Sequence, residues 1–434
     1  MNTIILFLTL ASILLISIKP KIGVYLIAIC LPIIGSNLYL FGLVIPIIDF
    51  VALITLIAFF ANFFYIRIFK SSEQTKLNWP IFLPFLLFFI ANLLSTFFAD
   101  KPLESFYYFL RWPFFLYFAY IFVPYNIIKD IKTLKKTIIL VFLSSMLVLL
   151  SGYLSLYGQD WQNNFFRMKS LFIFGSYPFG ENHNLIAEFL NIGVFFVLVI
   201  KEFIKEKRQK RIIDIIFALS AVGIIATFSR TGWITLILQL AIYLYYKTKY
   251  DKKERLGIIM LILFSAVMLS PLLWKMSVLQ DNNTSSTENR LLLTEISLKA
   301  FEEKPLFGQG SGQFINLVEN DIRFTAKYGS PIDSHGVIQK VLAENGVVGL
   351  LSLFFIFVYL LRFCFLAIKK YYPKVKWVLP FALAALGGIF FQFFNTSYYK
   401  GKVWFPLMLF MLAVNFSEQL YDKKNKDSSH PAKS

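Results

Sequence analysis

The stretch KEFIKEKRQKR-IIDIIFALSAVGIIAT-FSRT-GWITLILQLAIYLYY-KTKYDKKER (201–255) decides the fold. Two apolar runs are separated by only four residues, and strongly basic segments flank the pair. Apolar runs of this kind form helices in a bilayer, because a helix satisfies its backbone hydrogen bonds internally. Lys and Arg concentrate in cytoplasmic loops, so the stretch predicts a membrane hairpin whose turn, 228–231, faces outward.

Composition extends this pattern to the whole chain. Of the 434 residues, 57% are hydrophobic and only 16% are charged, and there are 50 Phe. A single soluble core could not bury so much apolar surface. The sequence therefore predicts an all-α polytopic transmembrane bundle of about 12–13 helices with one large, partly helical external loop. The predicted spans are 3–18, 22–42, 45–65, 79–98, 105–124, 137–157, 185–200, 212–228, 232–246, 256–274, 346–363, 377–395 and 403–417.

The net charge of +18 would suit a nucleic-acid-binding protein, but its distribution along the chain argues against that class. The basic residues gather in alternate short loops, as the positive-inside rule requires of a membrane protein. The segment 276–345 differs, with six basic and nine acidic residues. The segments predicted to be cytoplasmic are 66–78, 125–136, 201–211, 247–255, 362–376 and the tail. Those predicted to be external are 99–104, 158–184, 228–231, 275–345 and 395–402.

The same pattern predicts five parts along the chain. The first apolar run lacks a basic leader and a small-residue cleavage site, so it is interpreted as a retained span. Cys30 and Cys364 both lie in or beside apolar runs, which excludes a disulfide framework. The parts are N-terminal transmembrane helices (1–157), central transmembrane helices (158–274), a large external loop (275–345), C-terminal transmembrane helices (346–417) and a cytoplasmic tail (418–434).

Arg230 is the first candidate for a functional group. It lies in the turn 228–231, on the side of the membrane where positive charge is disfavoured. It could simply extend to lipid headgroups. Alternatively, its guanidinium could bind a phosphate at the membrane surface, which would explain a charge placed against the topological rule.

Arg290 is the second candidate. The spacing of Leu292, Ile296 and Lys299 predicts an amphipathic helix that begins near Glu288. An arginine in the first turn opposes the helix dipole, which suggests a ligand. A surface ion pair with Glu295 is the alternative.

His335 is the third candidate. Asp333 or Ser334 could cap a helix that re-enters the membrane, which would place His335 in the first turn. A helix N-terminus favours the neutral imidazole, which can then accept a proton from a sugar hydroxyl. A lone histidine is more often structural. The chain has only three histidines, so a metal site built on histidines is not expected, and neither is a cofactor.

Five further polar residues could line a substrate site. A structural role is the alternative for three of them: helix capping for the histidine and its neighbouring asparagine, and pairing with interfacial groups for Arg111. These residues are Arg111, Arg167, Lys169, His183 and Asn184. The glycine-rich stretch 305–312 is interpreted as a tight connector, because it lacks the strand and the Lys-Ser/Thr ending of a phosphate loop. His430 in the polar tail is interpreted as non-functional.

Four motifs in order resemble the O-antigen ligase and Wzy-type polymerase superfamily. They are FSRTGW (228–233), the Asn289-Arg290 pair, KPLFGQG (304–310) and SHG…AENGVVG (334–349). Together they cover roughly residues 175–350. The chain departs from the family at Gly336, where members commonly have asparagine after the histidine, so any role of that side chain is absent here.

The resemblance implies an inverting, metal-independent glycosyltransferase of the bacterial inner membrane with its site facing the periplasm. Its donor would be a glycan linked to undecaprenyl diphosphate, and its acceptor a lipid A core or another surface hydroxyl. Arg230 and Arg290 would bind the donor diphosphate, and His335 would accept the acceptor's proton. Ligase and polymerase activities both remain open. A transporter of lipid-linked glycan is the alternative from another class, although no internal repeat supports it.

Overall fold

The computed structural model describes residues 2–40, 43–69, 76–157, 159, 167–173, 175–250, 284–394 and 400–429. The predicted span 256–274 and His430 lie outside these residues. The elements in chain order are α1 (Asn2–Ile18), α2 (Lys21–Cys30), β1 (Asn37–Leu40), β2 (Leu43–Pro46), α3 (Ile47–Phe69), α4 (Phe82–Phe97), α5 (Pro102–Phe109), η1 (Leu110–Phe114), η2 (Tyr117–Phe122), α6 (Val123–Ile127), α7 (Ile131–Leu154), α8 (His183–Phe203), α9 (Lys207–Ala226), α10 (Arg230–Tyr250), α12 (Thr284–Glu303), α13 (Phe314–Asn320), α14 (Ile322–Tyr328), α15 (Val337–Tyr371), α16 (Val378–Gln392) and α17 (Gly401–Ser429).

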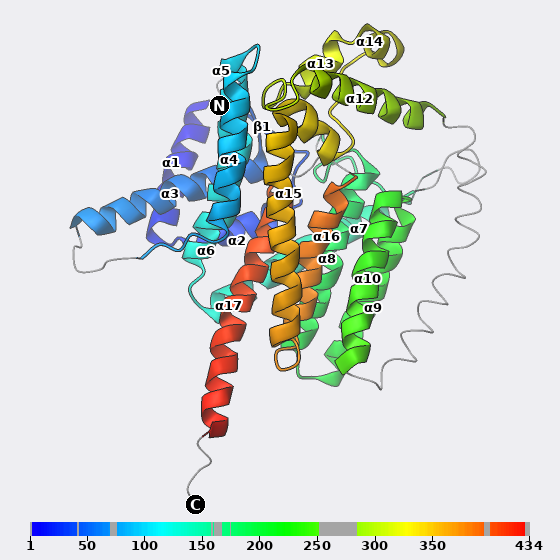
Figure 1. The fold of residues 1–434 in the computed structure, drawn as a ribbon. Coiled ribbons are helices and arrows are strands. Elements are labelled where there is room, and N and C mark those ends of the chain that lie inside the picture. The colour runs from blue at the N-terminus through cyan, green and yellow to red at the C-terminus, as the bar shows by residue number, and fades with distance from the viewer. Residues whose placement is uncertain are drawn as a thin grey trace, which may run out of the picture.

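The predicted all-α polytopic fold is confirmed. Six helices of the described chain are long and apolar enough to cross a membrane. The connections between α8 and α9 and between α15 and α16 lie at one end of the bundle, and α12, α13 and α14 lie at the other (Figure 1). The first two connections belong to segments predicted to be cytoplasmic, and the three helices belong to the predicted external loop. The division of charge along the sequence therefore matches the two ends of the fold.

The prediction of one span over 22–42 is wrong. Helix α2 ends at Cys30, and an antiparallel pair of strands follows, with Leu38 opposite Ile45 and Tyr39 opposite Val44. Pro32 lacks the backbone N–H that a continued helix needs, and Gly35 weakens helix formation further. Both lie inside the apolar run, so hydropathy alone extends the helix through them.

The predicted span 105–124 is one continuous rod built from four helical pieces. Helix α5 passes into the wider π-helical turns η1 and η2 before α6 ends the rod at Ile127. Pro113 lies inside η1 and Pro124 is the second residue of α6. A proline removes one helical hydrogen bond and crowds the preceding turn, which accounts for the widened turns beside these positions. Arg111 lies within η1.

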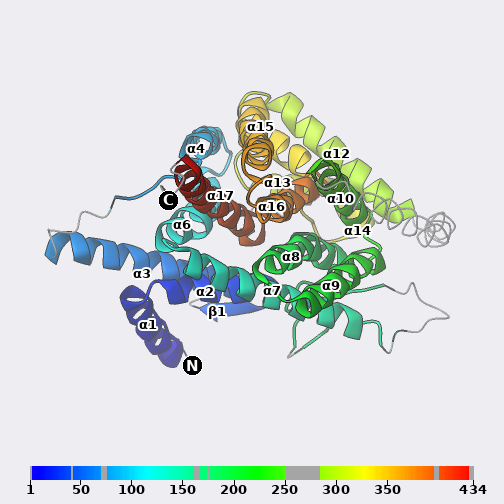
Figure 2. The ribbon, with the colours of Figure 1, turned by 90° about the horizontal axis from the view of Figure 1, so that it is seen from below.

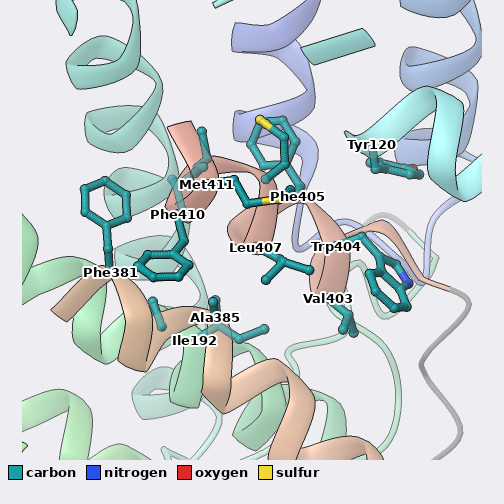
Figure 3. Packing of buried hydrophobic residues seen from close by; sticks show 14 of the residues in the cluster. Tyr120, Ile192, Phe381, Ala385, Val403, Trp404, Phe405, Leu407, Phe410 and Met411 are labelled. Atoms are coloured by element: carbon teal, nitrogen blue, oxygen red, sulfur yellow. The ribbon is translucent and has the colours of Figure 1, made fainter. Parts of the chain in front are cut away.

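The core of the bundle lies where α16 packs against α8 and α17. Figure 3 shows aromatic and aliphatic side chains of these helices interlocked, among them Phe381, Phe405 and Phe410. One ion pair lies inside this core: the Nζ of Lys402 is 2.6 Å from Glu188 Oε2, and both side chains are at most 1% exposed. A paired charge is tolerated there because each partner compensates the desolvation of the other.

Helices α12, α13 and α14 cover one end of the bundle (Figures 1 and 2) and share a small core of their own. Leu293 and Ile296 of α12 pack with Phe314 and Phe324 of the two short helices, and Ala343 of α15 completes the cluster. This cluster anchors α12, and with it Arg290, over the bundle.

The glycine-rich stretch 305–312 fits into a break in α15. Gly346 has a φ of 61°, so the helix is interrupted there. The amides of Val347 and Val348 then bond to the carbonyls of Pro305 and Leu306, and Gly310 N donates to Glu344 O at 2.9 Å. These bonds support the interpretation of this stretch as a connector. They join the external segment to the point where the predicted span 346–363 begins.

We expect Gly308→Ala to lower stability more than Gly329→Ala. Both glycines have positive φ, 69° and 79°, which costs an alanine about 1–2 kcal/mol. A Cβ at Gly308 would also lie 2.4 Å from the Glu344 carbonyl carbon, whereas one at Gly329 meets nothing within 4 Å. The clash should add roughly 1–3 kcal/mol. Thermal unfolding of both variants in detergent tests this expectation, and equal melting temperatures would contradict it.

Candidate functional site

The Ser229-Arg-Thr-Gly-Trp233 turn has a defined set of hydrogen bonds. Phe228 adopts a left-handed backbone conformation (φ 55°) that reverses the chain between α9 and α10. The Ser229 hydroxyl accepts a hydrogen bond from Gly232 N at 3.1 Å and so caps α10. Gly232 allows close approach to α8, since a Cβ there would lie 2.9 Å from Ala187 Cβ. These contacts place Arg230 at the first, exposed residue of α10.

Two segments from the predicted loop 158–184 meet this turn. The Ser229 hydroxyl donates to Asn184 Oδ1 at 2.6 Å, which joins the start of α8 to the start of α10. Met168 N donates to Ala226 O at 2.8 Å, which holds the neighbouring Arg167 close to the same turn. The cap of α8 is Asn182 rather than His183 or Asn184, so the expected capping role of those two residues is not what the structure shows.

Arg290 lies close enough to this group of residues for its charge to act on His183. The predicted amphipathic helix is present as α12, but it is described from Thr284, so Arg290 lies beyond the first turn. The positive charges of Arg167 and Arg290 both act on the imidazole of His183. Partial burial, together with the charge of Arg230, lowers the pKa of the Arg290 guanidinium.

Arg230 and Arg290 make no ion pair with any acidic residue in the part of the chain described above. The alternative of an ion pair between Arg290 and Glu295 is not observed, because Glu295 Oε2 lies 3.2 Å from Arg323 instead. Two neighbouring guanidinium groups without a carboxylate repel each other, and a bound anion would remove that repulsion. Their arrangement therefore suits an anion that carries more than one negative charge.

His335 belongs to the same cluster, although its helical position differs from the prediction. The helix begins at Val337 with Gly336 as its cap, and neither Asp333 nor Ser334 caps it. The Ser334 hydroxyl instead donates to Gly336 O at 2.8 Å. Burial and the charge of Arg290 lower the pKa of His335, while Asp333 opposes this shift. The imidazole is therefore predominantly neutral at pH 7 and can accept a proton.

Asp333 is held in place by a buried lysine, Lys340, which is not among the residues predicted from the sequence. Lys340 Nζ lies 2.6 Å from Asp333 Oδ1 and 3.3 Å from Glu344 Oε1, and its side chain is only 2% exposed. Glu344 in turn accepts a hydrogen bond from Phe314 N at 3.2 Å. The network links the segment before α15 to α13, so the backbone that carries His335 is fixed on both sides. Lys340 and Glu344 are four residues apart, which places them on one face of a helix, and this spacing is the sequence signal for the ion pair.

We expect Asp333→Asn to move the acid limb of the rate profile to lower pH. The Asp333 carboxylate raises the pKa of His335, whereas Arg290 from α12 lowers it. Removing the carboxylate lowers the pKa further, so the neutral base persists to lower pH. Rates of glycan transfer measured between pH 4 and 8 test this, with Asp321→Asn, at the cap of α14, as the control. An unchanged or raised acid limb would contradict the role given to Asp333.

One of the predicted lining residues lies apart from the cluster. Arg111 donates to Val44 O at 3.2 Å and lies over the Trp112 ring, beside the strand pair. Lys169 is exposed on the segment that carries Arg167. The structure thus brings Arg167, His183, Arg230, Arg290 and His335 together and leaves Arg111 outside. Among the described residues, no three His, Cys, Asp or Glu side chains group so as to hold a metal ion.

Fold and charge together define a polytopic helical membrane protein with a cluster of arginines and histidines at one end of its bundle. Residues 215–354 match the family model described as O-Antigen ligase, which supports the O-antigen ligase and Wzy superfamily for this part of the chain. The resemblance predicted from the four motifs is confirmed. The family implies a glycosyltransferase-like membrane enzyme with lipid-linked glycan substrates. No curated protein matches the chain.

Proposed function

We propose that this protein transfers a glycan from undecaprenyl diphosphate to a hydroxyl acceptor, a lipid A core or another surface glycan, at the outer face of the bacterial inner membrane. The observation that carries the proposal is the pair Arg230 and Arg290. These two neighbouring guanidinium groups form no ion pair with any carboxylate of the described residues. A diphosphate supplies the missing negative charge, and guanidinium groups bind phosphate oxygens with two parallel hydrogen bonds.

The proposed reaction is a single displacement. The acceptor oxygen attacks the anomeric carbon of the donor sugar, and the bond from that carbon to the diphosphate oxygen breaks with inversion. The proton of the acceptor hydroxyl passes to His335, and the diphosphate leaves with the bonding electron pair. Arg230 and Arg290 stabilise the charge that develops on the leaving group. No step requires a metal ion.

Polymerisation of lipid-linked repeat units is the second candidate. It uses the same donor and the same chemistry, and only the acceptor differs: the end of another lipid-linked glycan instead of a lipid A core. The family match covers both activities. Arg167 and His183 lie beside the arginine pair and are proposed to contact the donor or the first sugars.

The test is transfer by the purified protein in nanodiscs from undecaprenyl-diphosphate glycan to either acceptor, supplied separately. Product on lipid A core supports a ligase, and lengthened lipid-linked glycan supports a polymerase. Movement of the donor across the membrane without a new glycosidic bond would show a transporter and would overturn the proposal.

A further inference from the structure

A second cationic site lies among the connections predicted to be cytoplasmic. A cavity of about 240 Å³ lies between α2, α3 and the end of α6. Lys21, Lys76 and Lys129 line it together with an apolar wall that includes Phe59, Phe63 and Ile127. None of these residues belongs to the arginine cluster.

Hydrogen bonds fix the walls of this cavity. Asn126 is buried and pairs reciprocally with the backbone of Asn78, because Asn78 N donates to Asn126 Oδ1 at 2.9 Å and Asn126 Nδ2 donates to Asn78 O at 2.9 Å. This pair holds the segment that carries Lys76 against α6. Lys21 Nζ lies 2.7 Å from Asp130 Oδ2, which holds α2 against the start of α7. The cavity is therefore preformed.

The charge of this cavity is positive. Its lining includes three lysines and no acidic residue. Asp130 compensates Lys21, and it also caps α7 by accepting a hydrogen bond from Thr133 N at 2.7 Å. Lys76 and Lys129 are exposed and form no ion pair among the described residues. Two lysine charges therefore remain available to an anion.

We propose that this cavity binds the headgroup phosphate of an anionic phospholipid. Basic pockets between transmembrane helices on the cytoplasmic side suit such headgroups. The apolar wall reaches the exposed apolar surface of α3 through Phe63, whose ring centroid lies 5.6 Å from that of Phe64, and Phe64 is 54% exposed. The acyl chains lie along this face while the lysines hold the phosphate. This continuity favours a lipid over a free phosphate, and the inference does not depend on the transfer reaction.

Native mass spectrometry of the full chain in detergent tests the proposal. The protein is titrated with dioleoyl phosphatidylglycerol, dioleoyl phosphatidylcholine or inorganic phosphate. The test variant is Lys76→Gln/Lys129→Gln. The control is Lys205→Gln/Lys207→Gln, which removes the same charge from exposed positions of another basic connection.

We expect the wild type to bind one phosphatidylglycerol at least tenfold more tightly than phosphatidylcholine. A lysine near the membrane surface contributes about 1 kcal/mol, so the test variant should lose roughly 30-fold in affinity. The control should retain wild-type affinity. An equal loss in the control, or equal affinity for the two lipids, would overturn the proposal. So would displacement of the lipid by inorganic phosphate alone, which would reveal a free-anion site.

Discussion

Replacing His335 with alanine is expected to lower the turnover of glycan transfer by roughly 10²–10⁴-fold, the usual contribution of a general base. Donor affinity should change little, because the arginines rather than the imidazole bind the diphosphate. The half-buried His335, with its pKa lowered by burial and by Arg290, is the described imidazole best placed to act as a neutral base beside the arginine pair.

Two comparisons separate this role from a structural one. Added imidazole should partly restore the turnover of His335→Ala, since it can enter the space left by the side chain and accept the proton. His183→Ala should affect donor affinity more than turnover, because His183 lies within reach of the charges of both Arg167 and Arg290. A larger loss of turnover in His183→Ala than in His335→Ala would show that the base has been assigned to the wrong histidine.

The second large effect is expected from the arginine pair. Arg230→Ala and Arg290→Ala should each weaken transfer by about 3 kcal/mol, or roughly a hundredfold, because each removes donors to the departing diphosphate. Substitution by lysine should restore only part of this, since an ammonium retains the charge but lacks the paired geometry of a guanidinium. Steady-state kinetics measure the loss of transfer, and direct donor-binding measurements show how much of that loss comes from weaker binding of the donor.

Arg323→Ala is the matched control for this pair. Arg323 lies in the same external segment and is exposed, but it already pairs with Glu295 and Asp321. Its removal should leave donor affinity and turnover unchanged. Unaltered donor binding in both Arg230→Ala and Arg290→Ala would contradict the proposed role of the pair.

Much of the fold could be predicted because membrane helices follow simple physical rules. Apart from 22–42, each predicted span within the described residues coincides with a helix or with the rod 102–127. The failure at 22–42 shows the limit of hydropathy, since Pro32 and Gly35 interrupt the helix without lowering the apolar character of the run. The predicted division into five parts remains a prediction.

The site was only partly predictable. Arg230 and Arg290 stand out in the sequence because positive charge is unusual on the outer face of a membrane protein. Arg290 does not lie in the first turn of its helix as expected, since α12 is described from Thr284. The sequence also indicates His335, but the helix after it begins at Val337 with Gly336 as its cap, because Ser334 bonds to the backbone of Gly336 instead of capping. Arg111 is held by the strand pair, a tertiary contact that no local pattern indicates. The predicted roles of all these residues remain to be tested.

A structure of the protein in nanodiscs with its lipid-linked donor tests the central claim most directly. The account predicts that the diphosphate lies within hydrogen-bonding distance of the guanidinium groups of Arg230 and Arg290, with the anomeric carbon of the first sugar facing His335. A diphosphate bound away from these two arginines, whether deep in the bundle or at the lysine-lined cavity, would contradict it.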